Sequence, residues 1–261
     1  MPSIWSFPRI TRRAGKVWQR NLEVFLKTWK VNFFPPFIEA FLYLSAIGLG
    51  IGTYVGVIDG VPYITYIAPA ILAISVMNSA FFECTYGSYV RMYYQKSFDA
   101  IIATPLSIED VIAGEILWGA TRSVISVAVM LPVLVAFGVI SLPFSLFAIP
   151  LAFLGGLMFA GLAMCFTAIT PSIDTLNYPS FLLITPMMLF SGTFFPLSVL
   201  PAIFQYVALA VFPLTHLVAL MRMATLPSVS ALLPLHIAWI LAATVIFCVI
   251  SINLMRRRLI V

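Results

Sequence analysis

Long apolar runs dominate this chain, and they exceed the roughly 18 residues that mark a membrane-spanning helix. Only 9% of the 261 residues are charged and 62% are hydrophobic, against roughly 25% charged in soluble domains. We therefore expect an all-α integral membrane protein with a single transmembrane domain over residues 1–261. Cys84, Cys165 and Cys248 lie within apolar runs without C-x-x-C spacing, so neither a disulfide framework nor a metal site is indicated.

Turn signals divide the apolar sequence into six predicted spans. They are Phe33–Val57, Pro62–Ser88, Val111–Ile140, Leu146–Ile169, Tyr178–Phe195 and Val229–Met255. The first opens with Pro35 and Pro36, which a first helical turn tolerates. Small residues recur every four positions in two spans and predict close packing of another helix. These residues are Gly48, Gly52, Gly56, Ala152, Gly156 and Ala160.

The segment Pro196–Pro227 is the least regular part of the chain. Its two apolar pieces, Pro201–Val211 and Leu214–Met223, are separated by Pro213. At ~1.5 Å per residue each is too short to cross ~30 Å of hydrocarbon, so we expect an outer re-entrant helix pair between the fifth and sixth spans. Six crossings place both termini on one side. If that side is the cytoplasm, it receives twelve of the fourteen basic residues, as the positive-inside rule requires.

Residues 1–31 carry seven basic side chains and one acid, Glu23, without the apolar core of a signal peptide. Trp18, Leu22, Phe25 and Trp29 recur at helical spacing. This pattern predicts a cytoplasmic interfacial helix, with tryptophans at headgroup depth and cations facing anionic lipid. The alternative is a soluble helix that packs on a partner.

The stretch Arg91–Asp110 is a dense polar run between two apolar blocks. We expect a short helix over Phe98–Thr104 that lies across the mouth of two spans and ends where Pro105 follows. Ser107 and Asp110 have capping-box spacing and predict the start of the next helix. The alternative is a loop over 91–106 that only keeps two spans soluble at one end.

Glu39, Glu83, Glu115 and Arg122 lie inside predicted spans, where an ionisable side chain is a candidate for function. Helical rise places the three carboxylates at inner-leaflet depth and Arg122 deeper. Glu115 and Arg122 share a helix face, so Arg122 can reach toward Glu115 or a lumen. A structural ion pair and direct contact with an acidic substrate both stay open. His216 and His236 have no ligand-like spacing, so no metal site is expected.

No P-loop occurs, since Arg13-Ala-Gly-Lys16 lacks the G-x-x-x-x-G-K-[ST] pattern. We expect no enzymatic activity and no bound cofactor in this chain. Any energy from ATP must come from a second protein, which would then hold the ATP and Mg²⁺. No nucleic-acid partner is expected.

The chain resembles the permease subunits of ABC-2 type exporters, most closely the branch associated with lipo-oligosaccharide (nodulation-factor) export. The resemblance covers nearly the whole chain and is strongest at the motif that runs from Ser191-Gly-Thr-Phe-Phe-Pro196 to Pro213-Leu-Thr-His216. It implies an outer gate that includes Ser191, Gly192, Phe195, Pro196, Pro213 and His216. It also implies a coupling helix that contacts a separate ATPase through Lys96, Phe98, Asp99, Ile101, Ile102 and Thr104.

In such an exporter two permeases and two ATPases assemble in the bacterial inner membrane, with both permease termini in the cytoplasm. A lumen shielded from lipid also favours a symmetric dimer. The expected substrate is an amphipathic glycolipid or lipophilic compound. Related permeases that export drugs or polysaccharides are an alternative. So are an ion-coupled secondary transporter, which should show internal repeats, and an intramembrane lipid enzyme.

Overall fold

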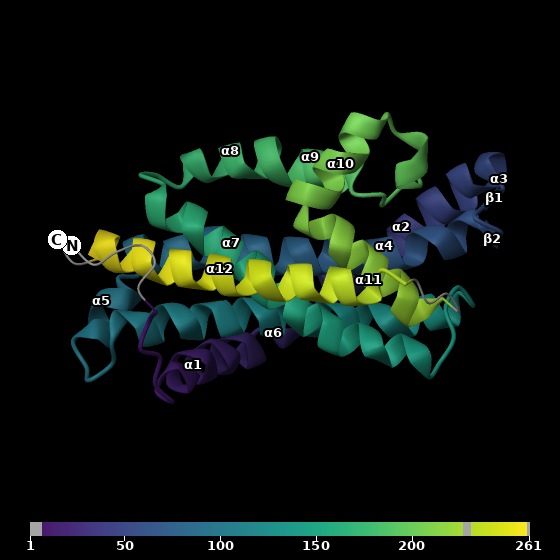
Figure 1. Ribbon diagram of the computed structural model, residues 1–261. Helices are drawn as coiled ribbons and strands as arrows, with labels where there is room; N and C mark the ends of the chain where they lie inside the picture. The colour runs from purple at the N-terminus through teal and green to yellow at the C-terminus, as the bar shows by residue number, and fades with distance from the viewer. Residues whose placement is uncertain (1–6, 227–230, 260–261) are drawn as a thin grey trace.

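Long helices lie side by side along one axis in the computed structural model, which describes residues 7–226 and 231–259 (Figure 1). The helices in the first half are α1 (Ala14–Lys27), α2 (Trp29–Tyr43), α3 (Gly52–Val55), α4 (Tyr63–Phe82), α5 (Ser97–Ile102) and α6 (Ile108–Ala136). The second half contains α7 (Ala148–Ile169), α8 (Asn177–Pro179), α9 (Thr185–Phe190), α10 (Ala202–Val211), α11 (Pro213–Thr225) and α12 (Leu233–Leu259). A hairpin of β1 (Val57–Ile58) and β2 (Val61–Pro62) links α3 to α4.

Four π-helical stretches connect or extend these helices, at Leu44–Ile51, Glu83–Gly87, Val90–Tyr94 and Ser180–Ile184. Short 3₁₀ turns cover Phe144–Phe147, Asp174–Leu176 and Leu197–Val199. In the described residues five helices are long and apolar enough to cross a membrane. They are Trp29–Val55, Tyr63–Tyr94, Ile108–Ala136, Phe144–Ile169 and Leu233–Leu259. The count rises to six if the bent pair α10–α11 is one span. The all-α membrane architecture is therefore confirmed.

The predicted re-entrant segment contains α10 and α11, which meet at an angle of 87°. Pro227, the last residue of that segment, lies outside the described residues. The same is true of residues 229–230, which begin the predicted sixth span, and of residues 1–6. The helical segment at the predicted fifth span is shorter than the prediction, because the helix ends at Phe190 and not at Phe195. Residues 177–190 reach only roughly 21 Å at 1.5 Å per residue. In Figure 1, α8 begins at the end of the bundle where α5 lies, and α11 finishes at the other end, toward α3.

The start of the first span was predicted too late. The helix begins at Trp29, so Pro35 and Pro36 lie inside α2 and not in its first turn. The predicted stripe of glycines is only partly correct: a Cβ at Gly48 would lie 2.5 Å from the Ile64 side chain, so α4 does approach closely there. Gly56 instead ends α3 with φ of 73°, a conformation that favours glycine.

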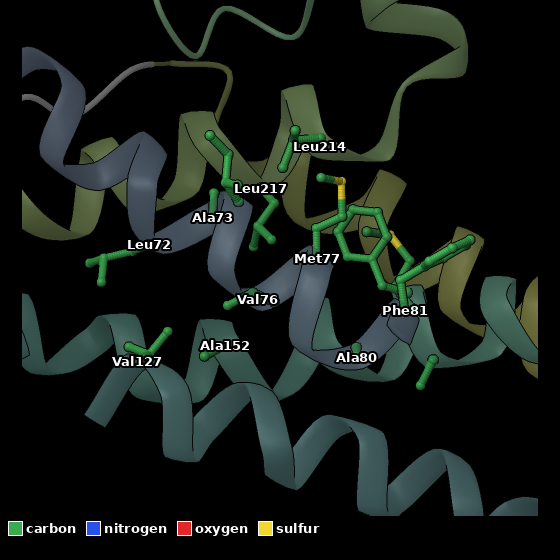
Figure 2. Close-up of a cluster of buried hydrophobic side chains, with 14 of the residues drawn as sticks. Leu72, Ala73, Val76, Met77, Ala80, Phe81, Val127, Ala152, Leu214 and Leu217 are labelled. Atoms are coloured by element: carbon green, nitrogen blue, oxygen red, sulfur yellow. The ribbon is translucent and has the colours of Figure 1, made fainter. Parts of the chain in front are cut away.

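The core is centred on α4, whose Leu72, Val76, Met77 and Phe81 pack against neighbouring helices (Figure 2). The predicted small face of α7 is confirmed, because a Cβ at Gly156 would lie 2.8 Å from the Ala120 backbone. Close backbone approach of this kind is how transmembrane helices gain packing energy without a hydrophobic driving force from lipid. The same packing holds α6 in a fixed place, and α6 carries Glu115 and Arg122, two of the four predicted intramembrane charges.

Candidate functional site

The helix α1 packs along the first half of α6 (Figure 1). Ala14 and Val17 are buried at the contact, and a Cβ at Gly114 of α6 would lie 2.6 Å from Val17. Trp18 donates from Nε1 to Thr121 Oγ1 at 2.8 Å, and Phe25 meets the Trp118 ring edge to face. A helix therefore forms within the segment predicted to be interfacial, and its aromatic face turns toward α6. Trp29, assigned to this helix, belongs to α2 because α1 ends at Lys27.

The chain before α1 is fastened to the start of α6. The predicted capping box of Ser107 and Asp110 is confirmed. The Asp110 carboxylate also accepts from Thr11 N at 2.6 Å and from Thr11 Oγ1 at 3.0 Å. Glu109 accepts from Arg9 N at 2.6 Å and from Arg256 Nη1 at 3.1 Å. Negative side chains at a helix N-terminus are favoured by its dipole, so this end of α6 joins three separate segments of the chain.

A buried charge network surrounds Glu115 in α6, whose side chain is 0% exposed. Oε2 accepts from Arg91 Nη2 at 2.6 Å and from Ser88 Oγ at 2.8 Å. Oε1 accepts from Asn21 Nδ2 at 2.8 Å and from Arg20 Nη2 at 3.4 Å. Burial lowers the pKa of Arg20, whereas the adjacent Glu115 carboxylate raises it. With four partners the Glu115 carboxylate meets the condition under which a buried charge is stable.

Glu83 extends this network. Its Oε1 accepts from Arg91 Nη1 at 2.8 Å and from Trp118 Nε1 at 3.0 Å. Its Oε2 lies 3.5 Å from Arg122 Nε. Gly87 lies beneath the pair, because a Cβ there would be 3.0 Å from Glu83 Oε1. The π-helical stretches Glu83–Gly87 and Val90–Tyr94 thus bring Glu83 and Arg91 together over a glycine.

The sequence leaves open whether Arg122 contacts Glu115 or faces a lumen. Arg122 contacts Glu83 and the Phe25 ring, with Cζ 5.0 Å from the ring centroid, and among the described residues it forms no ion pair with Glu115. Glu39 forms no hydrogen bond or ion pair with residues 7–226 or 231–259. Sequence reasoning also missed the central role of Arg91, which it placed in a loop. The spacing of Glu83, Gly87 and Arg91 at four-residue intervals is the signal that could have found it.

The polar stretch contains α5, which starts after Lys96 in a left-handed conformation with φ of 50°. Phe98 is 0% exposed, and Ile101 and Ile102 pack partly buried against the same core. Phe98 is therefore an internal anchor for α5 and cannot enter a pocket of another protein in this conformation. Lys96, Asp99 and Thr104 are exposed. So are Tyr93 (59%) and Tyr94 (61%), which sequence reasoning did not select.

At the opposite end of the bundle the turn after α9 is tied to α4 and α11. Gly192 has φ of 73°, and its carbonyl accepts from Arg222 Nη2 at 2.6 Å and from Tyr66 at 3.4 Å. The Arg222 guanidinium also lies 4.0 Å from the Tyr66 ring centroid. Arg222 is partly buried between these elements. Ser191 is buried and its hydroxyl has no partner among the described residues.

The other residues of this motif lie nearby. Phe195 and Pro196 are partly exposed, while Pro213 is buried at the first position of α11. His216 Nδ1 lies 2.8 Å from His236 Nδ1, and its ring stacks on Trp239 at 4.3 Å. The two histidines, whose sequence spacing indicated no shared site, are thus in contact. Among the described residues no group of three or more His, Cys, Asp or Glu side chains could hold a metal ion.

Long apolar helices, a bent helix pair and ion pairs buried between spans define a multi-pass helical membrane protein. The chain belongs to the ABC-2 type transporter family, whose model matches residues 14–226. It is therefore a membrane transport permease.

Curated relatives agree with this assignment. The chain is 34% identical to Nodulation protein J of Sinorhizobium fredii over 243 residues, covering 93% of this chain and 92% of the relative. It is 35% identical to Nodulation protein J of Rhizobium leguminosarum bv. viciae, covering 93% of each. It is 24% identical to the inner membrane transport permease YadH of Escherichia coli, covering 72% of this chain and 73% of that protein. No solved structure matches the chain significantly.

Proposed function

We propose that this permease is the membrane half of an ATP-driven exporter that moves an amphipathic glycolipid or lipo-oligosaccharide out across the bacterial inner membrane. Similarity to Nodulation protein J over almost the full length of both chains is the observation that supports this substrate class. Both termini lie in the cytoplasm, because the basic residues concentrate at the end of the bundle that holds α1, α5 and the last turn of α12. Two permeases assemble with two ATPase subunits.

The ATPase docks on the exposed side of the stretch that precedes and includes α5. Aromatic side chains are the usual anchors of protein interfaces, and Tyr93 and Tyr94 are exposed there with ring centroids 5.4 Å apart. Lys96 and Asp99 supply charges at the rim. Phe98, Ile101 and Ile102 support this surface from beneath and fix α5 to the membrane domain.

The docking surface is tested by copurification of the permease with its ATPase. Tyr94→Ala is expected to leave the permease folded and to weaken the association. Lys96→Ala should weaken it in a salt-dependent manner, because exposed charges are screened. Exposed Tyr178, outside the polar stretch, provides the matched control Tyr178→Ala. Equal association of both tyrosine variants would exclude this surface as the dock.

The transport activity is tested with the reconstituted complex in proteoliposomes. ATP-dependent movement of a fluorescent lipo-oligosaccharide, and stimulation of ATP hydrolysis by it, are the expected results. Stimulation by lipophilic drugs or by a polysaccharide without an acyl chain, and none by the lipo-oligosaccharide, would assign the permease to another export branch. Transport that follows an ion gradient without ATP would favour a secondary transporter.

A further inference from the structure

A polar pocket opens inside the membrane region between α2, α4 and α6. It has a volume of about 370 Å³, within the range of about 300–1,000 Å³ that small-molecule sites occupy. The residues that line it include Asn32, Glu39, Asn78, Ser79, Glu83, Arg122 and Ser126. Glu39 is about 15 Å along the helix that starts at Trp29, counting 1.5 Å per residue. The pocket therefore lies at inner-leaflet depth and not at the membrane surface.

Several polar groups in this pocket lack partners in the protein. The Glu39 carboxylate, the Asn78 amide and the Ser79 hydroxyl form no hydrogen bond with residues 7–226 or 231–259. Arg122 Nε is buried and has no hydrogen bond among the described residues, although it is ion-paired with Glu83 Oε2 at 3.5 Å. Unpaired polar groups are costly inside a membrane unless they line a water-filled cavity or bind a ligand. Their number in one pocket indicates a ligand with several hydrogen-bonding groups.

The charges in the pocket argue against an anionic ligand. Glu39 and Glu83 present two carboxylates to the pocket. Glu83 is paired with Arg122 and Arg91, whereas Glu39 forms no ion pair with the described residues. A phosphate would therefore meet the unpaired Glu39 carboxylate. A carboxylate accepts hydrogen bonds, a guanidinium donates them, and amides and hydroxyls do both. This mixed set matches a polyhydroxylated group such as a sugar.

An apolar groove continues from the same pocket along the lipid-facing side of α2. It is lined by Lys30, Val31, Phe34, Pro35, Ile38 and Glu39, and it shares Pro35 and Glu39 with the polar pocket. Val31 is 75% exposed and Phe34 is 62% exposed. A polar chamber that adjoins an apolar groove at one leaflet fits a molecule with a sugar head and an acyl chain.

We infer that this composite pocket is the inner-leaflet binding site for the exported glycolipid, with its polyhydroxylated head between Glu39 and Asn78 and its acyl chain along Phe34. The inference rests on the proposed export of a glycolipid and adds the place where the substrate enters. Asn78 and Glu39 determine specificity for the head, whereas Val31, Phe34 and Ile38 hold the chain.

The test uses the full-length permease in phosphatidylcholine nanodiscs with a dodecyl maltoside that carries a photoreactive diazirine in its alkyl chain. Crosslinks mapped by mass spectrometry are expected on Val31, Phe34 or Ile38. Unlabelled dodecyl maltoside should compete, and dodecyl phosphate should not. Asn78→Leu and Glu39→Leu should each weaken labelling at least tenfold, which corresponds to about 1.4 kcal/mol. Asn177→Leu is the matched control, because Asn177 is exposed and lies outside the pocket.

Three outcomes would overturn the inference: crosslinks confined to other helices, equal competition by dodecyl phosphate, or labelling that both pocket variants leave unchanged. Crosslink mapping on the unaltered protein decides the matter even if a variant fails to fold. Transport by the reconstituted complex is measured in parallel. Lipo-oligosaccharide export without labelling on α2 refutes only the site. Labelling on α2 without any export refutes the proposed function and leaves the site.

Discussion

The glycine at position 114 offers a sharp test of how α1 is held. An alanine there would place its Cβ 2.6 Å from Val17 Cβ and 2.7 Å from the Ala14 carbonyl oxygen. Real Cβ atoms essentially never have contacts under 3.0 Å, and the Ala14 carbonyl is backbone, so α1 itself has to move away from α6. Overpacking of this kind typically costs about 1–3 kcal/mol. Gly114→Ala should therefore lower the free energy of unfolding by this amount.

The shift of α1 should be local, because α1 is a separate helix held by side-chain contacts. Hydrogen exchange of the α1 amides is expected to accelerate, while exchange in α7 and α12 stays unchanged. Gly15→Ala is the matched control. A Cβ at Gly15 has no atom within 4 Å, and replacing a helical glycine by alanine stabilises by roughly 0.4–1 kcal/mol.

Protection of α1 that is the same in both variants would refute the close packing of α1 on α6. Faster exchange in Gly15→Ala but not in Gly114→Ala would show that the opposite face of α1 is packed. Thermal unfolding in phosphatidylcholine nanodiscs provides a second measurement. Gly114→Ala should lower the unfolding temperature, and Gly15→Ala should raise it.

Three further predictions follow from buried contacts. Phe98→Ala should destabilise the isolated permease by about 3–5 kcal/mol, because it empties a fully buried site; thermal unfolding without the ATPase measures this. Arg91→Ala leaves Glu115 without its nearest cation, and breaking a buried pair typically costs about 3–5 kcal/mol; the same unfolding assay applies, with Glu115→Gln expected to restore part of the loss. Arg222→Met removes the hydrogen bond to Gly192, about 1.5–3 kcal/mol for a charged donor; faster labelling of a cysteine at Ser191 should report the loosened turn.

Each of these predictions has a result that contradicts it. An isolated Phe98→Ala permease with unchanged stability would mean that this ring faces a partner, as the sequence pattern alone suggested. Equal stability of Arg91→Ala and the unaltered protein would mean that Glu115 is satisfied by Asn21 and Arg20 alone. If the cysteine at position 191 is still labelled slowly in Arg222→Met, contacts other than the Arg222 hydrogen bond keep the turn closed.

Hydropathy located the membrane segments well because each long helix has its own apolar signal. The capping box at Ser107 and Asp110 was also readable, since its partners are three residues apart. The fifth span was misjudged because residues after Phe190 are apolar but not helical: Gly192 needs positive φ and turns the chain there. Apolar length alone does not distinguish a helix from a turn packed in a membrane domain.

The charge pairing could not be predicted, for a different reason. Glu115 and Arg122 share a helix face, so local geometry left a contact between them open. The actual partners of Glu115 are Arg91 and Asn21, separated from it by 24 and 94 positions. Such contacts depend on how helices pack, and the π-helical stretches before Arg91 change the direction of its side chain relative to a regular helix. A single sequence contains neither piece of information.

The buried network explains how a displacement at α5 can reach the membrane interior. Phe98 fixes α5 to the core, and Asp110 and Glu115 at the start of α6 are bonded to Thr11 and Arg91. Separating these pairs inside the membrane would leave charges unpaired at a cost of several kcal/mol. Movement of the inner end is therefore cheaper as a rigid body that contains α1, α5, α6 and the inner part of α4 than as sliding between them. Because α4 also reaches Gly192 through Tyr66, this body is connected directly to the turn at the opposite end of the bundle.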